Sequence, residues 1–332
     1  MSAVTAEALS PAVLRTLPRP GCLLCGSAGS VIHAGVEDHY FHIPGRWTLK
    51  RCADPRCGLV WQDPMVIAED LSRAYAGYYT SAAPGRQESV GSGREFGATF
   101  YRLDRWASRL LKLEPERLRH ATAYLGDARP GALLDVGCGS GGFALAMRDR
   151  GWDVRGTEFD PAAARAAETQ GIAVDIGELS AIAYPSDSFD AITARHVLEH
   201  VQEPVAFLLE CWRILRPGGR LVVVTPNVDS LGHRHFADRW RGLEQPRHLF
   251  LYGSVSLRAL FRRTGVDGVD VFSSAQGADY VLRASHETSR GPWRRAIDYL
   301  AIWWLQFAEI ARTRSGSAVG EELVAIVTKP GV

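Results

Sequence analysis

A glycine-rich turn in the stretch LLDVGCGSGGF has residue types that suit a nucleoside-containing ligand. Asp135 ends an apolar run, and Gly137, Gly139 and Gly141 follow at every second position. Because glycine lacks Cβ and tolerates positive φ, such a turn lets the backbone approach a ligand closely. A second apolar run ends at Glu158, whose carboxylate would lie beside the turn and accept hydrogen bonds from ribose hydroxyls.

The spacing of this turn distinguishes between two cofactor classes. NAD-dependent dehydrogenases and enzymes that use S-adenosylmethionine (SAM) both combine a glycine turn with a downstream acid. The pattern here is D-x-G-x-G-x-G, and not the G-x-G-x-x-G of dinucleotide-binding folds. Asp135 also suits a cationic amino-acid group better than a pyrophosphate, so the turn favours SAM.

Histidines beyond the next strands are candidates for acid–base chemistry. His196 leaves the expected sheet at its ligand-binding edge, where a base could take the proton of an acceptor hydroxyl. His200, one turn later, is a weaker candidate. The alternatives are a locally hydrogen-bonded helix start for His196 and a packed core position for His200.

A loop rich in arginine follows the fifth expected strand. Residues 233–248, HRHFADRWRGLEQPRH, contain Arg234, Arg239, Arg241 and Arg247 among histidines and tryptophan. Such a loop over the cofactor edge suits an anionic substrate that carries phosphate or carboxylate. A solvated lid with a few salt bridges is the equally weighted alternative.

Four cysteines in the first part of the chain have metal-ligand spacing. Cys22-x2-Cys25 is followed, after 26 residues, by Cys52-x4-Cys57. Clustered cysteines in a cytosolic chain favour zinc over disulfides, and four thiolates leave no open position, so the zinc would be structural. The segment is too small for its own core, so the metal would supply its folding energy.

The chemistry-bearing residues require a sheet edge to hold them. From residue 132 onward, apolar strand patterns alternate with helical patterns, which predicts a parallel sheet covered on both faces. The expected strands are ALLDVG, DVRGTEF, IAVDIGE, FDAITARH, RLVVVTPN, DGVDVFSSA and EELVAIVTK. The helix EPVAFLLECWRILRPGG is expected to close at Pro217-Gly218-Gly219. The fold class is therefore α/β, a Rossmann-like sheet preceded by a small zinc-binding module.

A tryptophan-rich helix is expected between the last two strands. Six of its side chains fall at helical spacing and form one apolar stripe. Packing against the enzyme's own sheet, a dimer face, a lid and a membrane surface that presents a lipid-linked substrate are all compatible with that stripe. The six are Trp293, Ile297, Leu300, Trp304, Phe307 and Ala311.

Composition excludes several classes of protein. The 332 residues carry a formal net charge of +1, which gives no reason to expect nucleic acid as a partner. No apolar run has the length of a membrane span, and the N-terminal residues do not form a signal peptide, so a cytoplasmic enzyme is expected.

The motifs from residue 131 to residue 228 resemble class I SAM-dependent methyltransferases, in the group that includes ubiquinone-type O-methyltransferases. The matching stretches are LLDVGCGSGGF, GTEFDP, SFDAITARHVLEHV and LRPGGRLVVVTPN. The resemblance implies a seven-stranded sheet whose last strand runs antiparallel, a role that EELVAIVTK can fill. A "W…PRHL" stretch lines the substrate side in similar proteins, which makes His248 a second candidate base.

The resemblance also assigns cofactor contacts. Asp135, Gly137 and Gly139 would hold the methionine part of SAM, and Glu158 would bind the ribose. The adenine would lie between Phe159 and an acid that receives its amine. Glu178 stands at the place of that acid, and the further expected contacts are Cys138, Leu179, Arg195 and Tyr79. Packing between two domains is the alternative for Tyr79, and Cys138 is interpreted as a small filler, not a nucleophile.

The zinc module is similar to modules that precede the catalytic domain in bacterial glycan and natural-product methyltransferases. The expected organisation is a tail and zinc-ribbon-like module over 1–65, a helical linker and cap over 66–125, and the methyltransferase domain over 126–332. The leading hypothesis is methyl transfer to a hydroxyl of a sugar or natural-product intermediate. Ribosomal RNA methylation with the module binding the substrate is the second, and a non-catalytic SAM-fold scaffold is the third.

Overall fold

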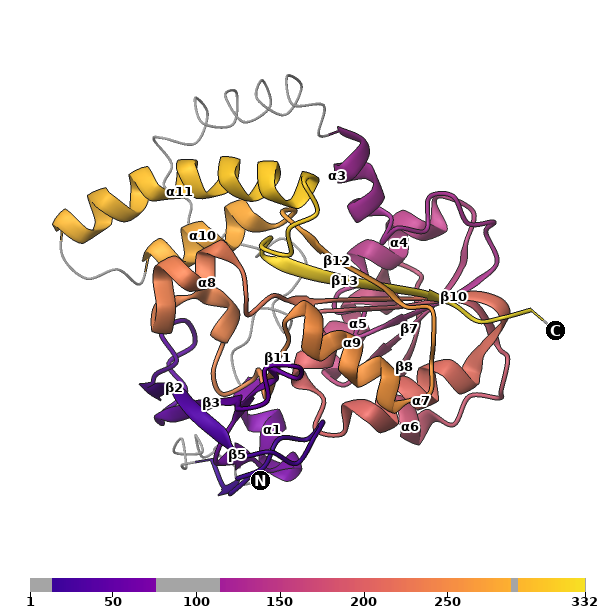
Figure 1. Cartoon of the computed structure of the whole chain (residues 1–332). Coiled ribbons are helices and arrows are strands. Elements are labelled where there is room, and N and C mark those ends of the chain that lie inside the picture. The colour runs from indigo at the N-terminus through magenta and orange to yellow at the C-terminus, as the bar shows by residue number, and fades with distance from the viewer. Residues whose placement is uncertain (1–13, 76–113, 288–291, 332) are drawn as a thin grey trace, which may run out of the picture.

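The computed structural model describes residues 14–75, 114–287 and 292–331 (Figure 1). Within these ranges the chain builds one large sheet, one four-stranded sheet and a two-stranded ribbon. Most of the helical linker and cap that is expected over residues 66–125 lies outside the described ranges, and so does Tyr79.

The large sheet has seven strands in the order β12-β13-β10-β9-β6-β7-β8. β6 to β10 run parallel, and β13 lies antiparallel between β10 and β12. This topology confirms the Rossmann-like seven-stranded methyltransferase fold. The strands are β6 Ala132–Val136, β7 Asp153–Glu158, β8 Ala173–Ile176, β9 Phe189–Arg195, β10 Leu215–Pro226, β12 Asp270–Ser274 and β13 Glu322–Thr328.

Both faces of this sheet are buried, as the continuous apolar strands predict. Along β10, Leu221 and Val223 pack into one hydrophobic cluster, while Val222 and Val224 pack into another.

The helices of the described chain are α1 Ala68–Leu71, η1 Ser72–Tyr75, α3 Glu114–Ala121, α4 Gly142–Arg148, α5 Pro161–Thr169, α6 Leu179–Ile182, η3 Leu198–His200, α7 Pro204–Ile214, α8 Leu231–Phe236, η4 Ala237–Arg239, η5 Arg241–Leu243, α9 Ser254–Arg263, α10 Ala278–Glu287 and α11 Pro292–Arg314.

One helix boundary differs from the expectation. α7 ends at Ile214, and the following Arg-Pro-Gly-Gly run belongs to β10, where the pairing register with β9 shifts between Leu215 and Arg220. Pro217 cannot continue a helix, and the irregular segment lets the chain turn back into the sheet.

The N-terminal module shares a sheet with the rest of the chain. Its four strands have the order β11-β4-β3-β2, and β11 comes from the far side of the sequence. Side chains of the module, including Trp61, join the same hydrophobic cluster as Phe250 and Tyr252. The module therefore also buries an apolar face against the large domain, and the contribution of zinc to its folding stays a prediction. Its strands are β2 Gly29–Val36, β3 Trp47–Cys52, β4 Val60–Gln62 and β11 Phe250–Leu251, and the ribbon pairs β1 Thr16–Leu17 with β5 Met65–Val66.

The helix α11 packs with a different face from the one expected. Figure 1 shows it grouped with α10 and α8. Trp304 and Phe307 of the predicted stripe are 63% and 45% exposed, whereas Ile302 and Leu305 are buried. The buried row also contains Asp298, which is partnered by His235 and Arg239, and Glu309. The buried face of α11 therefore includes Asp298, whose partners come from α8 and η4. The spacing of apolar residues alone does not predict this face. No helix in the described part of the chain is long and apolar enough to span a bilayer.

Candidate functional site

The glycine turn has the geometry that its sequence predicts. Gly137 and Gly139, between β6 and α4, have φ values of 68° and 55°, in the left-handed region. A Cβ on Gly137 would lie 2.5 Å from Val197 Cγ2, so the turn cannot accept a larger residue there without displacement. At Gly139 an added Cβ would meet nothing within 4 Å, which leaves that side of the turn open to a ligand.

Asp135 lies at the end of β6 beneath the turn. Its Oδ1 accepts a hydrogen bond of 2.8 Å from Thr193 Oγ1 on β9. Burial raises the pKa of Asp135 to about 6, against the opposing effects of Arg195 and Thr193. A nearby cationic group would favour the ionised carboxylate, so the position fits the ammonium group of a SAM methionine moiety.

Glu158 ends β7 and folds over the turn. Its Oε2 accepts the Gly139 N–H at 2.9 Å, and its Oε1 accepts the N–H groups of Phe159 and Asp160 at 2.9 and 3.0 Å. A carboxylate has about four acceptor positions, so capacity remains for ribose hydroxyls.

Aromatic and cationic side chains lie around the glycine turn and its two acids. Phe159 is 45% exposed, and the ring of Tyr75 meets it edge to face at a centroid distance of 4.9 Å. The Arg195 guanidinium lies 4.4 Å from the centre of the Phe143 ring. Tyr75 was not among the sequence candidates, because nothing in its local sequence places it against β7.

Cys138, Glu178 and Leu179 are further expected cofactor residues that the structure describes. The Cys138 side chain is buried against Gly156, and burial raises its thiol pKa to about 12, so it is a filler whose backbone alone lines the turn. Glu178 is exposed and precedes α6, while the neighbouring Leu179 is buried.

His196 lies between two carboxylates at the end of β9. Its Nε2 is 3.0 Å from Glu322 Oε1, and its Nδ1 is 3.4 Å from Glu199 Oε1. Glu322 also holds His120 Nε2 at 2.8 Å. The side chain is 46% exposed, and the two carboxylates raise the pKa of His196 to about 10 despite the partial desolvation of the ring. An imidazole protonated at neutral pH cannot accept a proton, so the geometry argues against His196 as the base.

The charge of His196 predicts a pH-dependent contribution to stability. Its folded-state pKa is raised above the ordinary value of 6.5, so its contribution is fully present below about pH 6.5 and is lost as the pH rises through about 10. We expect the difference in unfolding free energy between the wild type and His196→Gln to shrink between about pH 6 and about pH 10. Denaturant titrations of both proteins at the two pH values measure it. An unchanged difference would show that the imidazolium does not form.

His248 and His200 meet on the other side of Glu199. Their ring centroids are 4.7 Å apart, and Tyr75 Oη lies 2.7 Å from His200 Nδ1. His248 is buried, and burial lowers its pKa to about 4, so its ring is neutral at neutral pH. Since Tyr75 contacts both Phe159 and His200, this group lies next to the expected cofactor edge.

The four N-terminal cysteines converge as their spacing predicts. Their sulfur atoms all lie within 4.8 Å of one another, with Cys22 Sγ 3.5 Å from Cys57 Sγ and Cys25 Sγ 3.3 Å from Cys52 Sγ. Tetrahedral zinc with bonds of about 2.3 Å needs sulfur atoms about 3.8 Å apart. The cluster fits a structural Zn²⁺ ion, which would join the segment before β2 to the end of β3 and to the segment before β4.

Metal analysis tests this assignment. We expect Cys52→Ser and Cys25→Ser each to bind one zinc equivalent less than the wild type, because three thiolates hold the ion more weakly than four. Cys211→Ser, which alters a buried thiol outside the cluster, is the control and should retain the wild-type content. Equal zinc content in all the proteins would refute the site.

Neither alternative for the arginine-rich loop, an anion-binding loop or a solvated lid, holds for most of its arginines. Arg241 and Arg247 are buried, and both pair with Glu244. Arg239 pairs with Asp298, which leaves Arg234 exposed. These guanidinium groups neutralise the chain's own carboxylates, so they do not supply an anion-binding loop.

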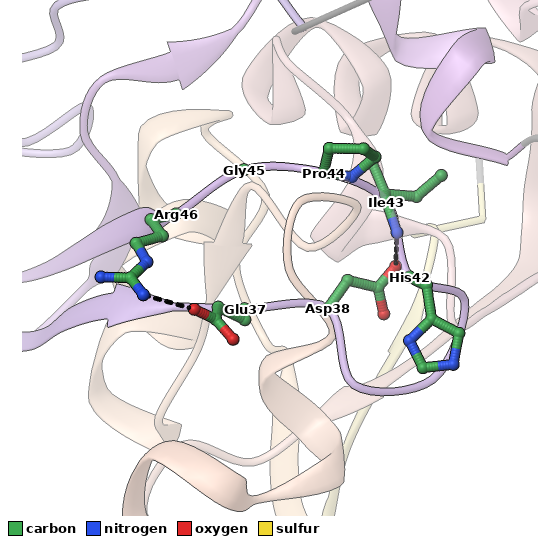
Figure 2. A pocket seen from close by; sticks show the side chains of 7 residues that line it. All are labelled: Glu37, Asp38, His42, Ile43, Pro44, Gly45 and Arg46. Carbon is green, nitrogen blue, oxygen red and sulfur yellow. Dashed lines mark hydrogen bonds and ion pairs between the residues drawn. The ribbon is translucent and has the colours of Figure 1, made fainter. Parts of the chain in front are cut away.

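A hollow of about 410 Å³ lies on the loop between β2 and β3 (Figure 2). Figure 2 shows Arg46 facing Glu37, at an N···O distance of 2.9 Å, and Asp38 directed toward the Ile43 N–H. None of the glycine-turn residues lines it, and its charges are already paired. We therefore place the chemistry at the sheet edge and not in this hollow.

Comparisons with known proteins identify the family of the chain. A sequence model described as "Methyltransferase domain" matches residues 106–271. The chain belongs to this methyltransferase family. The ubiquinone biosynthesis O-methyltransferase of Alkalilimnicola ehrlichii is 32% identical over 219 residues, covering 62% of this chain and 84% of that protein.

Further similarities are more partial. The enzyme of the same name from Xanthomonas oryzae pv. oryzae is 36% identical over 122 residues, or 35% of this chain and 51% of its own length. A SAM-dependent methyltransferase structure from Archaeoglobus fulgidus is 17% identical, with a TM-score of 0.45, over 66% of this chain and 94% of its own. The family match and the strand order of the large sheet, and not this structural similarity, identify the chain as a SAM-dependent methyltransferase with the class I fold.

Proposed function

We propose that this methyltransferase transfers the methyl group of SAM to a hydroxyl oxygen of a small molecule, a sugar or a natural-product intermediate. The observation that carries the proposal is the arrangement at the edge of the large sheet, where Asp135, the open face of Gly139 and Glu158 surround one turn. The similarity to ubiquinone biosynthesis O-methyltransferases favours oxygen as the acceptor atom.

The cofactor contacts follow from this arrangement. Asp135 would bind the methionine ammonium, the turn would approach the carboxylate end, and Glu158 would accept the ribose hydroxyls. Phe159 would cover the adenine, with Glu178 at the adenine edge. When bound, SAM supplies a sulfonium methyl group for an in-line displacement, and the residues of the chain align the acceptor and exclude water.

The acceptor hydroxyl would face the group formed by Glu199, His200 and His248, since the environment of His196 holds that ring protonated. Of the two predicted bases, His248 therefore remains the candidate side chain. Its neutral ring packs against His200, which contacts Tyr75, and Tyr75 in turn packs on Phe159 at the cofactor edge.

RNA methylation is a weaker proposal for this chain. Phosphate recognition needs available arginine and lysine side chains, whereas Arg241 and Arg247 are buried in ion pairs. A cytoplasmic location and a structural role of the zinc module remain predictions of the sequence.

The test uses purified protein, SAM labelled on its methyl group and a cell extract that is afterwards divided into small-molecule, lipid, glycan, RNA and protein fractions. Label in the small-molecule fraction that is lost with Asp135→Ala supports the proposal. Label confined to RNA would contradict it, and absence of SAM binding by calorimetry would refute the cofactor assignment.

A further inference from the structure

Three side chains outside the glycine turn converge on one point. Glu199 and His200 belong to η3, and His248 follows η5. Each offers one ligand atom, and these atoms lie within 4.8 Å of one another. The three residues, called the Glu199 cluster below, come from two segments nearly 50 positions apart (200 to 248) that the sheet edge brings together.

Both imidazole rings are oriented by backbone carbonyl groups. His248 Nδ1 lies 2.8 Å from the carbonyl oxygen of Gly242, and His200 Nδ1 lies 3.1 Å from that of Arg247. A carbonyl oxygen only accepts, so His248 Nδ1 donates and its Nε2 keeps its lone pair. His200 Nδ1 also lies 2.7 Å from Tyr75 Oη, so Nδ1 makes both contacts of this ring and Nε2 lies outside them. Metal-binding histidines show this pattern, in which a second hydrogen bond fixes the tautomer and the ring.

The carboxylate of Glu199 is buried and only partly satisfied. Its Oε2 accepts a hydrogen bond of 2.9 Å from Thr225 Oγ1. Its Oε1 is buried and has no hydrogen-bond partner, the nearest cation being His196 Nδ1 at 3.4 Å. The contact with His196 brings a basic group near Oε1 but no hydrogen bond, and a bound cation would complete the environment of this buried oxygen.

The charges around the cluster leave this role open. Glu244 Oε2 is 3.8 Å from His248 Nε2, but the carboxylate of Glu244 already pairs with Arg241 and Arg247. Arg247 is itself directed at Asp38. No arginine or lysine that the structure describes forms an ion pair with Glu199, and the basic side chain in contact with it is His196.

We propose that the Glu199 cluster binds a divalent transition-metal ion, Zn²⁺ or a close analogue, through two imidazoles and one carboxylate. Two histidines and one glutamate form a frequent ligand set of catalytic zinc sites, which keep a further position open for water or substrate. This site differs from the four-cysteine cluster, whose thiolates leave no position open.

The role of the ion rests on the function proposed above. An acceptor hydroxyl on the open position would lose its proton to solvent at a lower pH, because the metal stabilises the oxyanion. The oxyanion would then attack the sulfonium methyl group, the carbon–sulfur bond would break, and S-adenosylhomocysteine would leave. Under this inference His248 is a ligand and the metal replaces the general base.

The experiment titrates Co²⁺ into zinc-loaded protein that has been dialysed against a weak chelator. The closed thiolate site retains its zinc, and any exchange there produces an intense thiolate-to-cobalt charge-transfer band. Binding at the Glu199 cluster produces only weak ligand-field bands. We expect one further equivalent of Co²⁺ to bind without the charge-transfer band.

Variants locate the added ion. Glu199→Gln keeps an acceptor for Thr225, and His248→Gln keeps a polar side chain of similar reach. Each should weaken Co²⁺ binding at least about 10-fold, the smallest loss expected when even an outer-shell partner is removed. His33→Gln, which alters a ring paired with His233, is the matched control and should bind like the wild type. Thermal unfolding confirms that each variant is folded.

Two results would overturn the inference: no further equivalent in the wild type, or binding to the Glu199→Gln and His248→Gln proteins that equals the wild type. The labelled-SAM assay separates this from failure of the proposed function. Methyl transfer by a protein that binds no second metal refutes the metal site alone, and cobalt binding without methyl transfer refutes the proposed function alone.

Discussion

Glu158→Ala is expected to weaken SAM binding by about 10- to 150-fold, which corresponds to about 1.5–3 kcal/mol for lost hydrogen bonds to a charged group. The reason lies in the position of the carboxylate. It accepts the Gly139 N–H of the turn while keeping acceptor capacity toward the place where the ribose would lie. Alanine removes both the ribose contact and the support of the turn.

Two matched variants separate these contributions. Glu158→Gln keeps one acceptor oxygen without the charge, so its affinity for SAM should lie between those of the alanine variant and the wild type. Glu168→Gln alters an exposed acid on α5 and should leave the affinity unchanged. Calorimetric titration with SAM measures the wild type and the three variants. If Glu158→Ala binds SAM as tightly as Glu168→Gln does, the assignment of the ribose site is wrong.

The elements that hold this site were predictable because their signals are local. Strands such as β6 and β10 carry their own apolar runs, and Gly137 and Gly139 adopt left-handed φ values that favour glycine. The expected antiparallel last strand is β13, Glu322–Thr328. The differences concern the boundaries of these elements. For example, α7 ends at Ile214, and the turn-forming run that was expected to end this helix belongs to β10.

The protonation of His196 was not predictable from its neighbours in sequence. Glu199 stands three positions away, and the spacing H-x-x-E-H was a usable signal for it. Glu322, however, lies 126 residues away and reaches His196 only because β13 inserts between β10 and β12. Sequence patterns propose which residue types reach an edge, but the electrostatic partner that sets a pKa depends on the sheet order.

The arginine-rich loop was misjudged for the same reason. Local composition suggests a solvated or anion-binding segment, yet residues 240–248 are all buried. Their partners are Asp38 of the N-terminal module and Glu244 within the loop. Since β11 follows this loop directly and pairs with β4, the loop is the joint between the module and the methyltransferase sheet.

The second large expected effect is a loss of stability when Arg247 is removed from this joint. Arg247→Met is expected to lower the free energy of unfolding by about 3–5 kcal/mol, the usual cost of removing one member of a buried ion pair. The guanidinium of Arg247 is fully buried; Nη1 and Nη2 each donate to Asp38 Oδ2 at 3.0 Å, and Nη1 also donates to the carbonyl of Ala74. Methionine fills much of the volume but leaves the carboxylates of Asp38 and Glu244 buried with less compensation.

The exposed Arg234→Met is the control for the loss of an arginine as such, and it should change stability by less than about 0.5 kcal/mol. The double variant Asp38→Asn, Arg247→Met should recover part of the loss, because the uncompensated charge is removed along with its partner. Denaturant unfolding measures each free energy. Because the module and the large domain share a sheet and a hydrophobic cluster, the wild type should unfold in a single transition that includes the module. If Arg247→Met loses no more stability than Arg234→Met, the ion pair does not hold the joint.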